Sequence, residues 1–227
     1  YTRMPEDYDV FRCNQFYFED KYFLGKKVKA FFAVPHVFYY QYYTYKKLLQ
    51  SKQYDIENIV ISSWRFLEGR ILSRGDKNFL YAFPKVIQGH RFLEDRALGF
   101  QAMEELLEKL NFEYFYNNRV ATSGVYMCIF GVFAGYKEIY ITGIDFYANG
   151  GKYIHNITDK QNFLSAYPDF DGVPSKWHSQ DYDQEILTLL KSLGVKFYSL
   201  SKESAINTLL SPPPLLPMWH WINLSTA

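Results

Sequence analysis

Short apolar runs alternate with helix-like segments along most of this chain, and no other feature constrains the fold as strongly. Five runs are expected to form strands: "VFRC" at residues 10–13, "KVKAFFAVP", "ENIVISSW", "KEIYITGID" and "VKFYSLS". Four segments have helical length and spacing: "YYQYYTYKKLLQSKQY", "GFQAMEELLEKLNF", "TSGVYMCIFGVFAGY" and "DYDQEILTLLKSLG". Strands that alternate with helices predict an α/β fold, with a parallel sheet and helices on both of its faces.

Two of the expected helices carry a clear apolar face, with large apolar residues every three or four positions. These faces consist of Met103, Leu106, Leu107 and Leu110 in the first, and of Ile186, Leu189, Leu190 and Leu193 in the second, which Gly194 ends. The strand "KEIYITGID" is expected to be buried, whereas residues 65–88 are weakly patterned and are expected to be mostly loop. Residues 1–210 are expected to form one domain, followed by a proline-rich and tryptophan-rich tail at residues 211–227.

The bulk composition excludes several classes of protein. The formal net charge of +1 gives no electrostatic reason to expect binding to nucleic acid or to a strongly anionic membrane. Cys13 and Cys128 lie in apolar segments away from any Cys/His cluster, which argues for a reducing compartment and against structural zinc or a disulfide framework. Neither a signal peptide nor an apolar run of membrane-spanning length is visible. Aromatic residues make up 20% of the chain, which suits sugar binding, although a biased genome composition is the preferred explanation.

Three polar segments lie where a parallel α/β fold binds its ligands, outside the carboxyl ends of the strands. They are Asn14-Gln15, Thr122-Ser123-Gly124 and the stretch from Asp145 to Tyr153. A helix that begins with hydroxyls and glycine presents free N–H groups and the positive end of its dipole, which suits an anion. The alternative is a plain N-cap, in which Thr122 or Ser123 only completes the helix.

Several longer segments closely resemble the Campylobacter-type bacterial sialyltransferases of glycosyltransferase family 42. They are "YDVFRCNQFYFEDKYFLGKKVKAFF", "TSGVYMC", "GYKEIYITGIDFYANGGKY" and "HSQDYDQEILTLLKSL", which keep the order and approximate spacing of the family. The resemblance implies a Rossmann-like α/β/α sandwich of the GT-A-like kind, with a mainly parallel sheet and a lid near residues 147–181. It also implies an enzyme that transfers sialic acid from CMP-sialic acid to galactose, or to another sialic acid, on lipooligosaccharide.

The family inverts the anomeric centre without a catalytic metal, so no cofactor is expected beside the donor substrate. The departing CMP carries negative charge, which a metal-dependent transferase would neutralise with a cation at an Asp-x-Asp motif. The candidate motifs "DFD" at residues 169–171 and "DYD" at residues 181–183 are instead interpreted as solvated caps. Tyr147 and Tyr153 match the family's two phosphate-facing tyrosines, whose phenols donate hydrogen bonds to this charge. Their alternative role is aromatic packing at the surface.

His178 matches the family's catalytic histidine, a general base that takes the proton from the acceptor hydroxyl. The other four histidines are expected at the surface or in loops: His36, His90, His155 and His220.

The donor-binding residues follow from the same resemblance. Asn14 matches an asparagine that binds the donor, with Gln15 beside it. Thr122, Ser123 and Gly124 correspond to groups near the sialic acid carboxylate. Asp145 would face the nucleotide, where a carboxylate accepts from ribose hydroxyls, although a turn at the end of a strand explains it nearly as well.

The sequence departs from the family pattern at three places. The family's first strand ends in a glycine-asparagine-glycine loop that cradles the CMP phosphate, and this sequence is expected to start after that strand. Val34 stands where the family has an asparagine that contacts the donor sugar. Arg119 is displaced by one residue from the family's arginine before the TSG motif, and it is kept as a candidate for substrate binding.

The resemblance also implies partners and a location. Family members are often tetramers, and they associate with the inner face of the bacterial inner membrane, in the cytoplasm, through a C-terminal segment. The expected linkage is α-2,3. Two alternatives stay open: a truncated or degenerate relative that lacks activity, and a module that binds sialoglycan or sugar nucleotide without catalysis.

Overall fold

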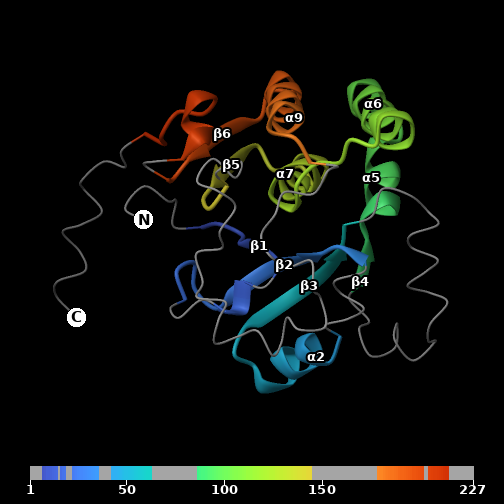
Figure 1. The fold of residues 1–227 in the computed structure, drawn as a ribbon. Helices are drawn as coiled ribbons and strands as arrows, with labels where there is room; N and C mark the ends of the chain where they lie inside the picture. Colours follow the sequence, from blue (N-terminus) through green and yellow to red (C-terminus); the bar gives the residue numbers. More distant parts are fainter. Residues whose placement is uncertain are drawn as a thin grey trace.

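The computed structural model has a Rossmann-like arrangement of strands and helices (Figure 1). The residues that it describes are 7–14, 16–18, 22–35, 42–62, 86–144, 178–201 and 204–214. The strands are β1 (Phe11–Cys13), β2 (Lys27–Ala33), β3 (Asp55–Ile61), β4 (Val86–Gln88), β5 (Glu138–Ile141) and β6 (Lys196–Ser199). The α-helices are α2 (Tyr42–Ser51), α5 (Gly89–Ala97), α6 (Gln101–Asn117), α7 (Ser123–Phe133) and α9 (Gln180–Ser192), and the 3-10 helices are η1 (Phe16–Phe18) and η3 (Ala205–Thr208). All the strands and helices expected from the apolar pattern are therefore present.

Every strand pair in the described part of the chain is parallel, which confirms the predicted parallel sheet. β1, β2, β3 and β4 form a sheet in that order, and β5 pairs with β6 in a second, two-stranded sheet. In the larger sheet Cys13 lies beside Phe32, Ala33 beside Ile61, and Ile61 beside Gln88. The carboxyl ends of the four strands therefore lie along one edge.

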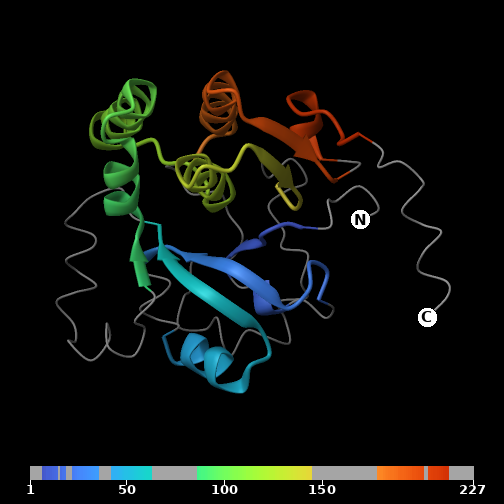
Figure 2. The ribbon, with the colours of Figure 1, turned by 180° about the vertical axis from the view of Figure 1, so that it is seen from behind.

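Helices lie on both sides of the four-stranded sheet: α2 is on one side and α7 is on the other, with α5 rising from the β4 edge and α9 beyond α7 (Figures 1 and 2). The side chains of β2 explain this arrangement because they alternate between the two faces. Ala30 and Phe32 join the core formed with α5, α7 and α9, whereas Phe31 and Ala33 pack with Tyr45 of α2. Burial of one Phe side chain contributes about 1.5–3 kcal/mol, so both faces of β2 stabilise the predicted α/β/α sandwich.

The predicted apolar faces of α6 and α9 are confirmed in large part. The buried residues are Leu106, Leu107 and Leu110 in α6, and Tyr182, Asp183, Ile186, Leu187 and Leu190 in α9. Met103, Leu189 and Leu193 are partly buried against the same core. Gly194 ends α9 with a φ of +81°, in the left-handed region that glycine adopts without strain.

One prediction about secondary structure is tested only at its end, and another is wrong. Residues 86–88 form β4, which leads directly into α5, whereas residues 63–85 lie outside the described part of the chain, so the expectation that residues 65–88 are mostly loop stays a prediction for the remainder. β5 is not a buried strand, because within the described residues only Ile141 of its four side chains is buried. Glu138 at its start is exposed and forms an ion pair of 3.0 Å with Lys196 of β6.

The described start of the predicted tail still contacts the domain. The carbonyl oxygen of Ser211 accepts a hydrogen bond of 3.1 Å from the N–H of Ser199, and Ser211 forms a parallel bridge with Tyr198. Residues 215–227 lie outside the described part of the chain. Among the described helices, none combines the length and apolar character needed to cross a membrane.

Candidate active site

The carboxyl edge of the four-stranded sheet carries the first predicted site residue. Asn14 follows β1, is half-buried, and donates its N–H to the carbonyl oxygen of Phe32 at 3.1 Å. Its φ is +54°, in the left-handed region that asparagine adopts more readily than most side chains. Val34, also half-buried, follows β2 at the same edge. Asn14 therefore lies at the edge where the sequence predicts it, and its contact with a donor stays a prediction.

The first turn of α7 reaches the same edge through two close approaches. A Cβ atom at Gly89, the first residue of α5, would meet the Tyr126 hydroxyl and would lie 2.7 Å from the carbonyl oxygen of Ile61. A Cβ atom at Gly124 would lie 2.5 Å from Cδ1 of Ile144, just after β5. Gly89 requires glycine because the clash is with a backbone atom, whereas at Gly124 the Ile144 side chain would have to shift. α7 therefore begins between the ends of β3 and β5, where the sequence predicts a binding site.

Thr122 does not cap α7 with its side chain, so the simple N-cap alternative is wrong for this residue. Thr122 occupies the N-cap position with an extended backbone, but its side chain accepts no capping hydrogen bond. Its hydroxyl instead donates to Oδ2 of Asp183 at 2.7 Å, and its N–H donates to Oδ1 at 3.0 Å. Thr122 therefore leaves the first N–H groups of α7 to another acceptor.

Asp183 is the one carboxylate among the described residues that is buried, with 1% of its surface exposed. The interpretation of residues 181–183 as solvated caps is therefore wrong for Asp183. Burial raises the pKa of the Asp183 carboxyl group, and the hydrogen bonds from Thr122 oppose this rise.

Sequence reasoning missed Asp183, although the spacing of α9 contains a signal. Asp183 lies three, four and seven residues before Ile186, Leu187 and Leu190, which are all buried. Residues at these separations share one face of a helix. A carboxylate on the buried face of a helix needs a polar partner from another segment.

His178 lies two residues before the start of α9, next to the N-cap Ser179, and is half-buried. Its Nδ1 atom is 2.8 Å from the carbonyl oxygen of Val120. Because a carbonyl oxygen only accepts hydrogen bonds, Nδ1 carries the proton, and in the neutral ring Nε2 then holds the lone pair. Val120 precedes Thr122 by two residues, so the structure brings the predicted base close to the start of α7.

Arg119 lies in the same region and contacts α6 and α9. Its guanidinium group lies over the ring of Tyr182, 4.4 Å from the ring centre. Its Nη1 atom is 3.2 Å from Oε2 of Glu113 and 3.7 Å from Oε2 of Glu185. These contacts join the segment before α7 to its two neighbouring helices, while the predicted role of Arg119 in substrate binding is not tested by them.

Other predicted residues lie outside the described part of the chain: Gln15, Asp145, Tyr147 and Tyr153. Their roles stay predictions, as does the lid, of which only residues 178–181 are described. His90 is described, and it is buried in α5 rather than exposed, so that expectation is wrong. Within the described ranges, no three His, Cys, Asp or Glu side chains are grouped in a way that could hold a metal ion.

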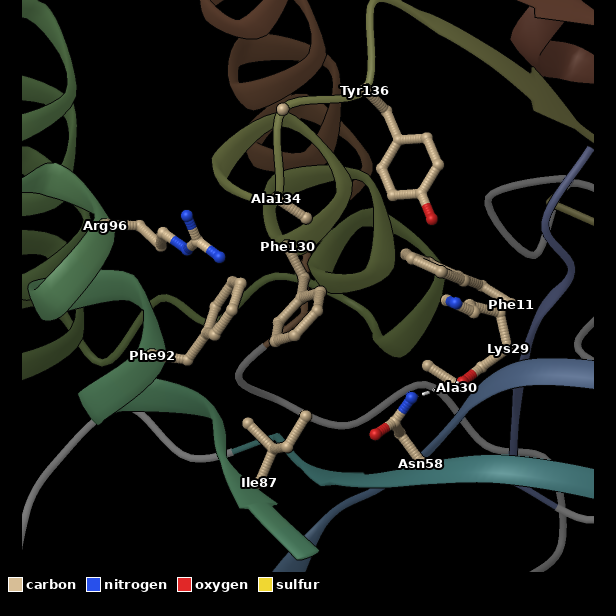
Figure 3. A pocket seen from close by; sticks show the side chains of 11 residues that line it. Phe11, Lys29, Ala30, Asn58, Ile87, Phe92, Arg96, Phe130, Ala134 and Tyr136 are labelled. Carbon is tan, nitrogen blue, oxygen red and sulfur yellow. Dashed lines mark hydrogen bonds between the residues drawn. The ribbon is translucent and has the colours of Figure 1, made fainter. Parts of the chain in front are cut away.

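A separate pocket of about 440 Å³ lies near the C-terminal end of α7 (Figure 3). Phe92 of α5 and Phe130 of α7 form a stacked pair with ring centres 4.1 Å apart. The side chains of Arg96, Asn58 and Tyr136 also line it. The site residues described above lie at the opposite end of α7, so this pocket is distinct from the candidate active site.

Comparison with known proteins places these features in a family. The model of the alpha-2,3-sialyltransferase (CST-I) family matches residues 1–216. An uncharacterized protein of Haemophilus influenzae is 33% identical over 172 residues, which are 74% of this chain and 71% of that protein.

Solved structures of sialyltransferases from Campylobacter jejuni share the fold. CstII in complex with the substrate analogue CMP-3FNeuAc has a TM-score of 0.81 and 39% identity, over 95% of this chain and 81% of that one. The monofunctional alpha-2,3-sialyltransferase Cst-I has a TM-score of 0.78 and 40% identity, over 94% of this chain and 74% of that one. The sialyltransferase CST-II with a trisaccharide acceptor and CMP has a TM-score of 0.77 and 38% identity, over 95% and 81%. This chain belongs to the CST-I alpha-2,3-sialyltransferase family.

Proposed function

We propose that this protein transfers sialic acid from CMP-sialic acid to a galactose-terminated glycan, with inversion at the anomeric carbon. His178 acts as the general base. The observation that carries this proposal is the hydrogen bond of 2.8 Å between Nδ1 of His178 and the carbonyl oxygen of Val120, at the approach to α7. Membership of a sialyltransferase family and relatives solved with CMP and a donor analogue support the choice of donor.

The proposed chemistry uses the lone pair on Nε2 of His178. The acceptor hydroxyl gives its proton to Nε2 while its oxygen forms a bond to the anomeric carbon of sialic acid. The bond between that carbon and the phosphate oxygen breaks, and CMP leaves with the bonding electrons. Direct displacement of this kind inverts the anomeric centre. The hydrogen bond from Nδ1 holds the ring in the tautomer that accepts the proton.

The start of α7 is the proposed binding place for the sialic acid carboxylate. The hydroxyl of Thr122 is bonded to Asp183 and does not cap the helix, so it leaves the first N–H groups of α7 to another acceptor, which is proposed to be this carboxylate. Ser123 and Gly124 supply two of these groups. Asn14, at the carboxyl edge of the same sheet, is the proposed partner of donor hydroxyls.

Tyr147 and Tyr153 are proposed to stabilise the negative charge on the departing CMP. Asp145 is proposed to contact the nucleotide, and Gln15 is proposed to contact the donor. These roles come from the resemblance of "YITGIDFYANGGKY" to the family. Two phenol donors replace a cation in this account, so the reaction is proposed to need no metal. A lid over these residues would exclude water during transfer.

A galactose-terminated glycan of lipooligosaccharide is the proposed acceptor, with an α-2,3 linkage. A family model of alpha-2,3-sialyltransferases supports the linkage, and a CST-II structure with a trisaccharide acceptor supports a glycan acceptor. The proposed location of the protein, which follows from this proposed acceptor, is the inner face of the bacterial inner membrane, in the cytoplasm.

A homo-oligomer, by resemblance a tetramer, is proposed as the active form. Three aromatic side chains on α6 support this proposal because they are largely exposed: Phe112 at 55%, Phe115 at 53% and Tyr116 at 75%. The ring centres of Phe112 and Tyr116 lie 4.9 Å apart, so the two exposed rings are neighbours on the helix. Exposed apolar surface of this kind is typical of protein interfaces.

Val34 favours one second candidate, a relative that binds sugar nucleotide without transferring the sugar. Val34 lies after β2 at the carboxyl edge, where the family has an asparagine that contacts the donor. A valine side chain cannot donate or accept a hydrogen bond there. Val34→Asn distinguishes the two functions, since it would create transfer activity in an inactive protein.

The test of the proposed function is incubation of the purified full-length protein with CMP-sialic acid and a fluorescent lactoside. A product heavier by one sialic acid residue, cleaved by an α-2,3-specific sialidase, supports the proposal. If calorimetry shows donor binding but no product forms, and if Val34→Asn then produces the sialylated product, the second candidate is supported instead. Absence of both donor binding and product would contradict both functions.

A further inference from the structure

Asp183 occupies an unusual place for a carboxylate. It is buried in the first turns of α9, and the N-cap of that helix is already provided by Ser179, whose Oγ accepts the N–H of Tyr182 at 3.3 Å. Asp183 is therefore not needed to cap its own helix. Because burial of a carboxylate costs free energy unless it is well hydrogen-bonded, the groups that hold Asp183 indicate its role.

Both carboxylate oxygens of Asp183 bond to a single residue that lies 61 positions away in the chain. Oδ2 accepts the hydroxyl of Thr122 at 2.7 Å, and Oδ1 accepts its N–H at 3.0 Å. Two parallel hydrogen bonds to a carboxylate fix orientation as well as distance. They set the position of the N-cap of α7 relative to α9.

Neighbouring contacts join the same two segments. Nδ1 of His178 donates to the carbonyl oxygen of Val120, and the guanidinium group of Arg119 lies over the ring of Tyr182. Residues 119–122 and 178–183 therefore form one bonded unit. This unit contains the imidazole ring and the start of α7, the two parts that must be in register when an acceptor attacks a bound donor.

We propose that Asp183 is a positioning residue for sialyl transfer, which acts through Thr122. Its carboxylate keeps the start of α7 in place for the carboxylate of the donor, and it keeps the Thr122 hydroxyl directed away from the first N–H groups of that helix. Without this contact, the hydroxyl turns to cap α7, as threonine does at an N-cap. It then competes with the donor for the same N–H groups. This inference rests on the proposed function, since it assumes that the start of α7 binds sialic acid.

The test compares two ligands that differ in the sialic acid. Isothermal titration calorimetry on the full-length protein measures the Kd of CMP-3FNeuAc, which carries the sugar carboxylate, and of CMP, which lacks it. Asp183→Asn keeps the size of the side chain and is expected to weaken CMP-3FNeuAc binding by about tenfold, while CMP binding changes by less than about twofold. Asp95→Asn removes the same charge at an exposed position in α5, away from the proposed site, and is the matched control, with both Kd values unchanged.

Variants of Thr122 provide the second arm. Thr122→Val removes the hydroxyl and is expected to weaken CMP-3FNeuAc binding, whereas Thr122→Ser retains the hydroxyl and recovers most of that loss. The double variant with Asp183→Asn should be little weaker than either single variant, because both changes remove one shared contact. If Asp183→Asn does not fold, the comparison of Thr122→Val with Thr122→Ser decides the question.

Two results would overturn the role of Asp183. One is a folded Asp183→Asn protein with the Kd of the wild type for CMP-3FNeuAc; the other is equal weakening of CMP and CMP-3FNeuAc, which indicates a general structural effect. Failure of the proposed base would show itself differently, as unchanged transfer by a His178→Ala protein. Donor affinity does not depend on that step, so the two failures are distinguishable.

Discussion

Nδ1 of His178 lies 2.8 Å from the carbonyl oxygen of Val120, a main-chain atom 58 residues earlier in the sequence. The contact connects the start of α9 to the segment that enters α7, and it leaves Nε2 as the acceptor nitrogen of the neutral ring. Because the acceptor is a main-chain carbonyl oxygen, substitution of the Val120 side chain does not remove it. The orientation of the imidazole ring therefore depends on how the two segments pack, which Thr122 and Asp183 also determine.

Titration of Asp183 should make the thermal stability of the protein depend on pH. Burial raises the pKa of this carboxyl group in the folded state above its unfolded value near 3.9. The folded state then binds the proton more tightly than the unfolded chain, so this contribution to stability is full below about pH 4 and is lost as pH rises through the folded pKa. Asp183→Asn does not titrate. The thermal midpoint of the wild type relative to this variant should therefore fall as pH rises from about 4 toward neutrality.

Differential scanning fluorimetry of both proteins over this pH range provides the measurement. Asp95→Asn, at an exposed position in α5, serves as the control for the loss of one surface carboxylate. If the thermal midpoint of the wild type minus that of Asp183→Asn stays constant or increases with pH, the assignment of a raised pKa to Asp183 is refuted.

The two thiols should be poorly reactive in the folded protein. Burial, with a smaller effect of the nearby Asp183 charge, raises the pKa of Cys128 to about 12. Burial also raises the pKa of Cys13 to about 11. The reactive thiolate is therefore scarce at pH 8. Iodoacetamide followed by mass spectrometry should show slow alkylation of native Cys128, with Cys13 reacting faster because it is half-buried, and rapid alkylation of both in guanidinium. Fast native alkylation of Cys128 would contradict this account.

The aromatic surface of α6 should control the oligomeric state. Phe112→Glu combined with Tyr116→Lys places charges on a surface that is proposed to be buried between copies of the chain, so the molar mass in solution should fall. Phe23→Ser is the matched control, because Phe23 is exposed at 50% but lies outside α6. Light scattering after size exclusion gives the mass, and an unchanged mass in the α6 variant would remove this surface as the interface.

Chelators should leave transfer unaffected, because the proposed reaction stabilises the departing CMP with tyrosine hydroxyls. The initial rate of sialyl transfer in millimolar EDTA is expected to equal the rate in its absence. Addition of Mg²⁺ or Mn²⁺ should not raise it. A rate that falls in EDTA and returns with either cation would establish metal-assisted departure instead.

The strands with two buried faces were the easiest part of the fold to predict. β2 and β3 are apolar on both sides, because Phe32 and Val60 pack toward α7 while Phe31 and Ile61 pack toward α2. β4 was missed because it has only three residues in a weakly patterned region. A strand this short has too few positions to establish a period.

The prediction that β5 is buried is wrong because its side chains alternate between a covered and an open face, although the sequence resembles a continuous apolar run. Ile139 contacts α7, where a Cβ atom at Gly131 would lie 3.3 Å from Cδ1 of Ile139. Glu138 and Tyr140 point to the other side, beside Lys196 and Tyr198 of β6. In a strand with one covered face, apolar and polar side chains alternate, and Glu138 at the start of β5 indicated this alternation.

The contacts of buried polar residues could not be predicted from the sequence of a single segment. Asp183 and His90 were expected at the surface because of their residue type, yet both are buried on helix faces shared with apolar side chains. The helical position of Asp183 indicated burial, but its partner could not be read from spacing, and no helix was expected around His90. The bonds from Thr122 to Asp183 and from His178 to Val120 span 61 and 58 residues, and only the packing of α9 beside α7 creates them.

The most direct test of the central claim is the rate of sialyl transfer by His178→Ala, with its affinity for CMP measured alongside. Loss of a general base lowers kcat by about 10²–10⁴-fold, and CMP binding should stay at the level of the wild type. Thr188→Ala, an exposed substitution ten residues later in α9, should retain full activity in the same assay. A His178→Ala protein that binds CMP and transfers sialic acid at the wild-type rate would contradict the account.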